Sequence, residues 1–245
     1  MIILVVGASG ATGSQLVEQL LIQKHKVKVI VRSPVKLPEA WNTNDNLQII
    51  SASLLELSDH EMSVIVSDCN AVASCLGHNM TFKGIYRQPR QLVTDATRRL
   101  CNAIKSKNLQ NPIKFVLMNT TGNRNRDLNE SISFAQKCII GLLRLLLPPH
   151  VDNEKAADYL RTQIGQNNNS IEWIAVRPDG LINADEVTNY EIHKSPTRSA
   201  IFNAGKVSRI NVGHFMASLI NDDNLWTTWK GQMPVIYSKL WVDKA

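Results

Sequence analysis

The feature that most constrains this chain is a set of three glycines close to its beginning. They follow an apolar run in "IILVVGASGATGSQLVEQLL" and are spaced as Gly7, Gly10 and Gly13. Residues 2–6 are typical of a strand buried on both faces, and residues 11–24 predict a helix with one apolar side. Glycines between a strand and a helix let the backbone approach a ligand that side chains would keep away.

The rest of the chain repeats this alternation of strand and helix. The apolar patterns predict strands at 27–31, 47–50, 71–76, 113–119 and 171–178, and helices at 58–67 and 88–107. Strands that alternate with helices favour an α/β fold, a doubly wound parallel sheet covered on both faces.

We expect one domain over residues 1–245, because this length suits a single core with at most a small substrate-side extension at its C-terminal end. Two segments, at about 120–150 and 179–205, look inserted or appended and follow strand ends. Parallel sheets collect their ligands at the carboxyl ends of the strands, so these segments are expected on the substrate side.

The composition argues against several classes of protein. The net charge is +6, but Lys and Arg are dispersed and form no nucleic-acid-binding motif, so we expect no direct binding of nucleic acid. Four cysteines lie in apolar surroundings without metal-ligand spacing and are expected to be buried, reduced thiols of a cytoplasmic protein without a bound metal: Cys69, Cys75, Cys101 and Cys138.

The longest apolar run is "CIIGLLRLLLPP", which Arg144 interrupts and Pro148 ends. It is shorter than the roughly 20 residues that a membrane span needs. We expect a helix here to be buried on most sides or to cover a substrate cleft. A seam in a homodimer stays an alternative.

Each glycine of the turn has a distinct role in binding a dinucleotide. Gly7 permits a tight turn, Gly10 admits a pyrophosphate, and Gly13 allows close packing of the helix on the strand. The first amide groups of the helix, from Ala11 onward, then face the phosphates with the positive end of the helix dipole. The hydroxyls of Ser9 and Thr12 are further predicted donors to the cofactor.

"VVGASGATG" followed by "VIVRSP", with "MNTTGN", "VRPDGLIN" and "VSRINVGHFMASLI" further along, resembles the short-chain dehydrogenase/reductase superfamily. More narrowly it resembles the atypical NAD(P)H-binding proteins, which include NmrA-like regulators and the biliverdin-IXβ/flavin reductases. The resemblance covers most of the chain and implies an NAD(P)-binding Rossmann fold.

The end of the second strand indicates which dinucleotide is bound. An acidic residue there would hold the adenosine 2′-hydroxyl of NAD, but the chain has Arg32 and Ser33. An arginine fits a 2′-phosphate with paired hydrogen bonds, so we predict that NADP(H) is preferred over NAD(H).

The resemblance implies further cofactor contacts at the other strand ends. Ser53 stands where the family usually has an aspartate that reads adenine. The remaining predicted cofactor residues are Leu54 after the third strand, Cys75, Leu76 and Gly77 after the fourth, Asn119 and Thr120 after the fifth, Pro178, Gly180 and Leu181 after the sixth, and Lys155.

The resemblance also places the candidate catalytic residues, Asn119, Thr120 and Lys155. Relatives with the usual mechanism carry Tyr-x-x-x-Lys, in which the tyrosine moves the proton. Here the residue four positions before Lys155 is Val151, which cannot transfer a proton. His78, Tyr86 and Tyr159 are possible replacements, although a structural role is favoured for each.

Three functions are therefore weighed. The favoured hypothesis is an NADP(H)-dependent oxidoreductase that transfers hydride to a flavin, a quinone or another small conjugated carbonyl acceptor, since flavin reduction needs little acid catalysis from the protein. The alternatives are a non-catalytic NADP(H)-sensing regulator of the NmrA-like type and, less favoured, an enzyme like the nucleotide-sugar epimerases.

Overall fold

The computed structural model describes residues 1–34, 37–78, 81, 86, 88–107 and 111–239. Its centre is an eight-stranded sheet in the order β3-β2-β1-β4-β5-β6-β10-β8. The strands in chain order are β1 (Ile2–Val6), β2 (Lys26–Val31), β3 (Leu47–Ser51), β4 (Ala71–Ser74), β5 (Ile113–Met118), β6 (Ile171–Pro178), β8 (Tyr190–His193) and β10 (Val235–Ser238). All neighbours are parallel except β10 and β8. The predicted α/β fold class is confirmed.

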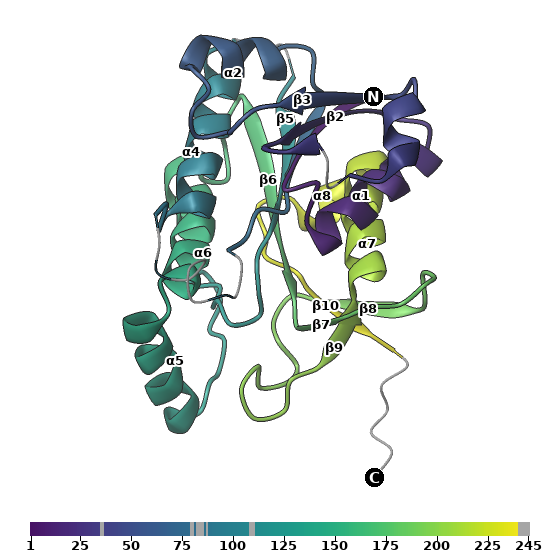
Figure 1. The fold of residues 1–245 in the computed structure, drawn as a ribbon. Coiled ribbons are helices and arrows are strands. Elements are labelled where there is room, and N and C mark those ends of the chain that lie inside the picture. The colour runs from purple at the N-terminus through teal and green to yellow at the C-terminus, as the bar shows by residue number, and fades with distance from the viewer. Residues whose placement is uncertain (35–36, 79–80, 82–85, 87, 108–110, 240–245) are drawn as a thin grey trace.

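Helices cover both faces of this sheet (Figure 1). One face carries α1 (Ala11–Ile22), α7 (Arg209–Asn221) and α8 (Asp223–Trp229), and the other carries α2 (Asp59–Val66), α4 (Leu92–Lys105) and α6 (Pro148–Tyr159). Successive side chains of each strand point to opposite faces of the sheet. Each face therefore packs against its own helices and forms its own apolar core. Short elements complete the chain: the 3₁₀ turn η2 (Glu39–Thr43), the π-helical turn η3 (Leu160–Ile164), and the two-stranded parallel sheet of β7 (Gly180–Ile182) and β9 (Lys206–Ser208).

Helix α5 (Phe134–Leu146) corrects one expectation. It is not buried on most sides, because Phe134 and Leu145 are each 80% exposed and the helix projects from the sheet beside α6 (Figure 1). Only Gln136 and Ile140 are buried on its inner side. The two prolines that open α6 end α5 at this point.

The cysteines agree with expectation in three of four cases. Cys69, Cys75 and Cys101 are buried and all four cysteines are free, but Cys138 is exposed because it lies on the outer side of α5. Burial raises the pKa of the Cys75 thiol to about 12, so it stays protonated and unreactive near neutral pH.

A buried ion pair joins the end of β6 to the loop after β5. The guanidinium of Arg177 is fully buried and donates from Nη2 to Oε1 of Glu130 at 2.7 Å and from Nη1 to Oε2 at 3.1 Å. Arg177 also donates to the carbonyl oxygens of Asn123, Met233 and Lys194. The pair therefore fixes the loop that follows β5 relative to the rest of the sheet.

We predict that Glu130→Leu lowers the free energy of unfolding by about 3–5 kcal/mol, because the Arg177 charge would stay buried without its partner. Urea denaturation measures this change. The control is Lys230→Ala, which removes a pair with Glu172 whose side chains are 46% and 27% exposed and should cost less than about 1 kcal/mol. Equal losses in the two variants would contradict the role given to the buried pair.

Candidate functional site

The glycine turn lies directly against the end of β4. Gly7 has a φ of +80°, and a Cβ atom there would be 2.5 Å from the carbonyl carbon of Cys75. A Cβ atom at Gly13 would be 2.1 Å from the carbonyl oxygen of Gly7. Both distances are impossible for real side chains, so glycine is required at these two positions by the packing of turn, helix and strand.

Gly10 is different, because its surroundings leave room. A Cβ atom there would meet only the Gly7 carbonyl oxygen, at 3.2 Å, and Ser9, Gly10 and Ala11 are exposed. Gly10 caps α1 and supplies no side-chain hydrogen bond, whereas the helices α2, α5, α7 and α8 are capped by the side chains of Ser58, Ser133, Ser208 and Asp222. The first amide groups of α1 thus have space in front of them for a phosphate.

The other predicted cofactor residues on this side line the carboxyl ends of adjacent strands. Arg32 and Ser33 are exposed directly after β2, and Ser53 is half-buried after β3, next to the buried Leu54. After β4, the buried Cys75 has its Sγ atom 4.0 Å from the Met216 sulfur, so its side chain packs in the core. Leu76 is half-buried and Gly77 exposed. These positions surround the point where the strand order reverses between β1 and β4, which is where such sheets bind dinucleotides.

Asn119 joins the end of β5 to α6. Its Nδ2 atom donates to the carbonyl oxygen of Asn153 at 2.9 Å, and its Oδ1 atom accepts from the Thr120 amide at 2.9 Å and from Asn123. Asn119 is buried, so its contacts position α6 and Thr120. The half-buried Thr120 has its Oγ1 atom 3.3 Å from the amide of Gly122, which donates to it.

Asp179 connects the segments that follow β5 and β6. It accepts from the Thr121 hydroxyl at 3.0 Å and from the Gly205 amide at 2.8 Å. Burial raises the pKa of this carboxyl group. The neighbouring predicted residues are the buried Pro178, the exposed Gly180 and the half-buried Leu181.

A cleft of about 410 Å³ opens beside Thr121 and Gly122. Most of its lining residues are polar, with hydroxyl and amide side chains and the guanidinium groups of Arg124 and Arg198. Ile132, Ile140 and Phe202 supply apolar surface. All of the lining residues belong to 121–140 and 195–202, within the segments that the sequence placed on the substrate side.

Helix α6 carries Lys155 and Val151 one turn apart, with Lys155 exposed and Val151 half-buried. The Val151 side chain has no proton to transfer, so the usual tyrosine mechanism is absent. The predicted residues thus form two groups, one around the glycine turn and one around the β5 and β6 ends.

The three side chains considered as replacements for the tyrosine are held in structural contacts. A ring nitrogen of His78 lies 2.7 Å from Oδ2 of Asp152, which also accepts from the first amides of α4. Burial raises the pKa of Asp152, but the bonds from His78, Thr94 and Val93 outweigh it and lower that pKa overall. Tyr86 donates to the Leu146 carbonyl, and Tyr159 lies under the Arg98 guanidinium.

Sequence reasoning overlooked one residue beside this site. A Cβ atom at Gly122 would be 3.4 Å from Cε1 of His150 and 3.7 Å from Oγ1 of Thr120, so the His150 ring faces the end of β5. Its position directly before Val151 was the available signal.

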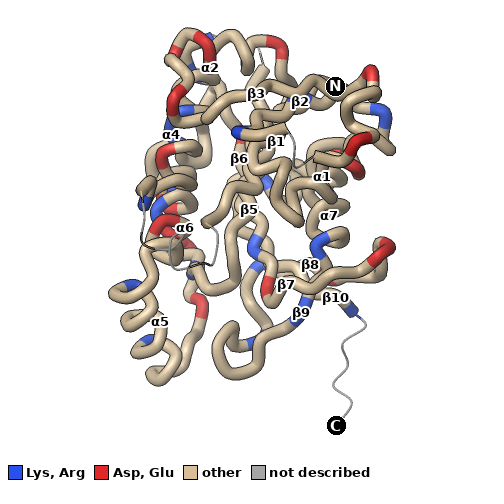
Figure 2. Tube along the Cα trace, in the orientation of Figure 1, with Lys and Arg blue, Asp and Glu red and all other residues tan. Residues whose placement is uncertain are grey.

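Charge is distributed over the whole surface. Figure 2 shows Lys and Arg interspersed with Asp and Glu along the chain, with no one element carrying the basic excess of the described residues. In this part of the chain, His, Cys, Asp and Glu form no group of three or more that could hold a metal ion. None of the described helices combines the length and apolar character that a membrane crossing requires.

The uncapped glycine turn at the switch point of a doubly wound sheet indicates a dinucleotide site, and the sequence agrees with that geometry. The model of the NAD(P)H-binding family matches residues 7–223. The chain belongs to this family. It is also 28% identical over 195 residues to an uncharacterised chloroplastic protein of Arabidopsis thaliana, a match that covers 80% of this chain and 64% of the relative.

Known structures share the fold of this NAD(P)H-binding protein at low sequence identity. A short-chain dehydrogenase/reductase from Veillonella parvula, in complex with NADP, has a TM-score of 0.70 and 17% identity, covering 97% of this chain and 94% of the other. A proposed NADH-flavin reductase from Streptococcus pneumoniae has a TM-score of 0.67 and 17% identity, covering 98% and 100%. The oxidoreductase ylbE from Lactococcus lactis has a TM-score of 0.68 and 14% identity, covering 97% and 91%.

We predict that Gly10→Ala folds normally but binds NADPH at least 10-fold more weakly. The added methyl group would meet one backbone oxygen at 3.2 Å, a tight contact that a shift of a few tenths of an ångström relieves, yet it occupies the space through which a pyrophosphate would approach α1. Quenching or enhancement of NADPH fluorescence measures the affinity. The control is Gly141→Ala, because a Cβ atom there meets open space on α5. Unchanged affinity in the Gly10 variant would contradict the predicted position of the phosphates.

Proposed function

We propose that this protein is an NADP(H)-dependent oxidoreductase that reduces a small conjugated acceptor, such as a flavin or a quinone. The observation that supports this most is the cleft of about 410 Å³ beside Thr121 and Gly122, at the same sheet edge as the glycine turn. A cleft of this size accommodates a flat acceptor of one to three rings. The fold shared with a proposed NADH-flavin reductase is in keeping with this assignment.

The cofactor would be held by groups at these strand ends, of which Thr12, Leu54, Cys75 and Pro178 have buried side chains. The amides at the start of α1, with Ser9 and Thr12, would bind the diphosphate, and Arg32 with Ser33 would bind the 2′-phosphate. Ser53, Leu54, Cys75, Leu76 and Gly77 would surround the adenosine half, the last three mainly through their backbone. Lys155, Pro178, Gly180 and Leu181 would contact the nicotinamide half. Bound NADPH would supply the hydride.

Thr120 would be the residue that faces the acceptor. Its hydroxyl can donate a hydrogen bond to an acceptor oxygen or nitrogen as that atom gains negative charge. Asn119 would act through Thr120 and α6, since its polar atoms are already engaged with Thr120, Asn123 and Asn153. An acceptor that needs little acid catalysis suits a site with valine in place of tyrosine.

The second candidate is a regulator that binds NADP(H) without turning it over. Val151 favours this alternative, because the usual proton donor is missing. A regulator would bind NADPH and capture a partner according to cofactor occupancy, but would not consume the nucleotide. An epimerase-like activity is less favoured, since it depends on the missing tyrosine.

We predict that Arg32→Ala weakens NADPH binding about 10-fold or more while NADH binding changes less than 2-fold. The guanidinium would contact only the 2′-phosphate strongly, and the loss of one charged hydrogen-bonding group costs about 1.5–3 kcal/mol. Competition titrations with both nucleotides measure the two affinities. Equal losses for NADPH and NADH would contradict the predicted cofactor preference.

We predict that the protein oxidises NADPH with at least one member of a panel of free flavins, quinones and conjugated aldehydes. Ala200→Trp should then raise KM for that acceptor about 10-fold without changing NADPH affinity, because Ala200 lines the cleft. The control is Val187→Trp, a surface position that is 37% exposed. Nucleotide binding with no turnover across the panel would favour the regulator.

A further inference from the structure

His150 lies between Gly122, which lines the cleft, and Glu154, which lines a second, smaller cavity. It stands in the first turn of α6, and its side chain is only 11% exposed. A methyl group on Gly122 would be 3.4 Å from Cε1 of His150, 3.8 Å from its Nδ1 atom and 3.7 Å from Oγ1 of Thr120. Because Gly122 has no side chain, one edge of the imidazole faces the Thr120 hydroxyl across this glycine. Gly122 also lines the cleft.

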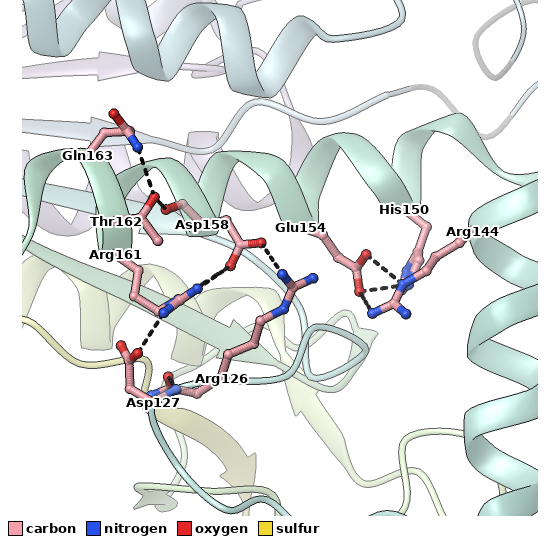
Figure 3. A network of polar contacts seen from close by, with 10 residues as sticks. Arg126, Asp127, Arg144, His150, Glu154, Asp158, Arg161, Thr162 and Gln163 are labelled. Atoms are coloured by element: carbon pink, nitrogen blue, oxygen red, sulfur yellow. Dashed lines mark hydrogen bonds and ion pairs between the residues drawn. The ribbon is translucent and has the colours of Figure 1, made fainter.

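The opposite edge of the ring faces charged groups. Nε2 of His150 is 3.6 Å from Oε1 of Glu154, too far for a hydrogen bond, and has no hydrogen-bond partner among the described residues although it is buried. Arg144 holds the Glu154 carboxylate with two bonds of 2.8 Å, from Nε and Nη2. Figure 3 shows these three side chains at one end of the network, with Asp158 of α6, Arg161 of η3 and Arg126 of the loop after β5 at the other.

The smaller cavity adjoins Glu154 and has a volume of about 50 Å³. Its lining is mainly polar and consists of Asn123, Arg124, Arg126, Arg144, Glu154, Ala157 and Asp158. Oδ1 of Asn123 and Nε of Arg124 are, like Nε2 of His150, buried without a hydrogen-bond partner in the described chain. A polar cavity of this size holds one or two water molecules, each of about 30 Å³. Gly122 thus connects the ring to the cleft, and Glu154 connects it to a polar cavity that can hold water.

We propose that His150 supplies the proton for reduction of the acceptor, in place of the missing tyrosine. This inference rests on the proposed function. The acceptor gains a hydride, with two electrons, from NADPH, and the oxygen or nitrogen atom that becomes negative takes the Nδ1 proton of the imidazolium. The neutral ring that remains carries its proton on Nε2, and water returns a proton to the ring for the next cycle. One NADPH, one acceptor and one proton give NADP⁺ and the reduced acceptor.

The groups around His150 set the pH range in which it could act as a proton donor. Burial lowers the pKa of His150, the Glu154 carboxylate opposes that effect, and the Arg144 guanidinium adds to it. Arg124, Arg126 and Asp158 line the smaller cavity together with Glu154. Because the imidazolium is the donor, reduction should slow as pH rises through the pKa of His150, and this fall should begin below the usual histidine range.

The first test is the pH profile of acceptor reduction by the full chain. We expect His150→Gln to reduce kcat about 100-fold or more and to remove this limb of the profile, while NADPH affinity stays within 2-fold. Imidazole added to His150→Ala should restore part of kcat. The control is His60→Gln, at an exposed position on α2. A profile and kcat unchanged in His150→Gln would overturn the inference and leave the proposed function intact.

A second variant tests the same inference in case His150→Gln fails to fold. Gly122→Ala places a methyl group at ordinary contact distance from His150 and Thr120, so the protein should fold, and kcat should fall about 10-fold because the ring is separated from the acceptor. If kcat is unchanged, the ring does not reach the acceptor through this position. If the unaltered protein shows no turnover with any acceptor, the proposed function itself is overturned.

NMR can follow the protonation of His150 without any measurement of activity. In NMR spectra of protein with ¹³C-labelled histidine, the Cε1 signal that disappears in His150→Gln should titrate below the usual histidine range. The same signal should shift in Gly122→Ala and on saturation with NADP⁺ plus an acceptor analogue that cannot be reduced. A signal that titrates like free histidine and ignores both changes would overturn the placement of His150 at the cleft.

Discussion

The close approach of the turn at Gly7 to the end of β4 is the constraint on which the site depends. A Cβ atom on Gly7 would lie 2.5 Å from the Cys75 carbonyl carbon, so two backbone segments meet there without any side chain between them. This contact sets where α1 begins relative to the sheet. Gly13 is needed for the same reason, because a Cβ atom on it would lie 2.1 Å from the carbonyl oxygen of Gly7. The uncapped amides of α1 therefore point to a fixed place at the carboxyl edge of the sheet, where a phosphate can meet them.

Helix α6 organises the second half of the site in a similar way. Asp152 accepts hydrogen bonds from the first amides of α4, and the Asn153 carbonyl accepts one from Asn119 at the end of β5. These contacts fix the height and rotation of α6, and with them the positions of Lys155 and His150. The Arg177–Glu130 pair fixes the opposing loop. Together they place a polar cleft next to the end of β5.

The part of the fold that depends on local pattern was predictable. The strands at 2–6 and 171–178 have the expected bounds, and each of the other predicted strands differs from its expected range by one or two residues at one end. Helix α7 and strands β8 and β10 were not predicted, for reasons of tertiary packing. Gly213 weakens the helical signal of α7, yet a Cβ atom there would be 2.8 Å from the Leu16 amide, so it is needed for the close contact with α1. Strands β8 and β10 are only four residues long.

The candidate site likewise has a part that could be predicted from local sequence and a part that could not. The glycine turn and the residues after β2 are local in sequence, so their chemistry could be inferred from the residue order alone. The acceptor side depends on pairs that are far apart in the chain, such as Arg177 with Glu130, Asp179 with Gly205, and His150 with Gly122. No spacing rule connects such residues. Of the two expectations for α5, burial on most sides was wrong, whereas Gln136 and Ile140 of α5 do line the cleft. Apolar composition alone does not show which neighbours a helix packs against.

Calorimetric titration of the purified protein with NADPH and with NADH tests whether a dinucleotide binds at the start of α1, on which every role above depends. We expect saturable binding of one NADPH per chain, and weaker binding of NADH. Absence of any measurable binding of both nucleotides would contradict a dinucleotide site, and both the oxidoreductase and the regulator would then be excluded.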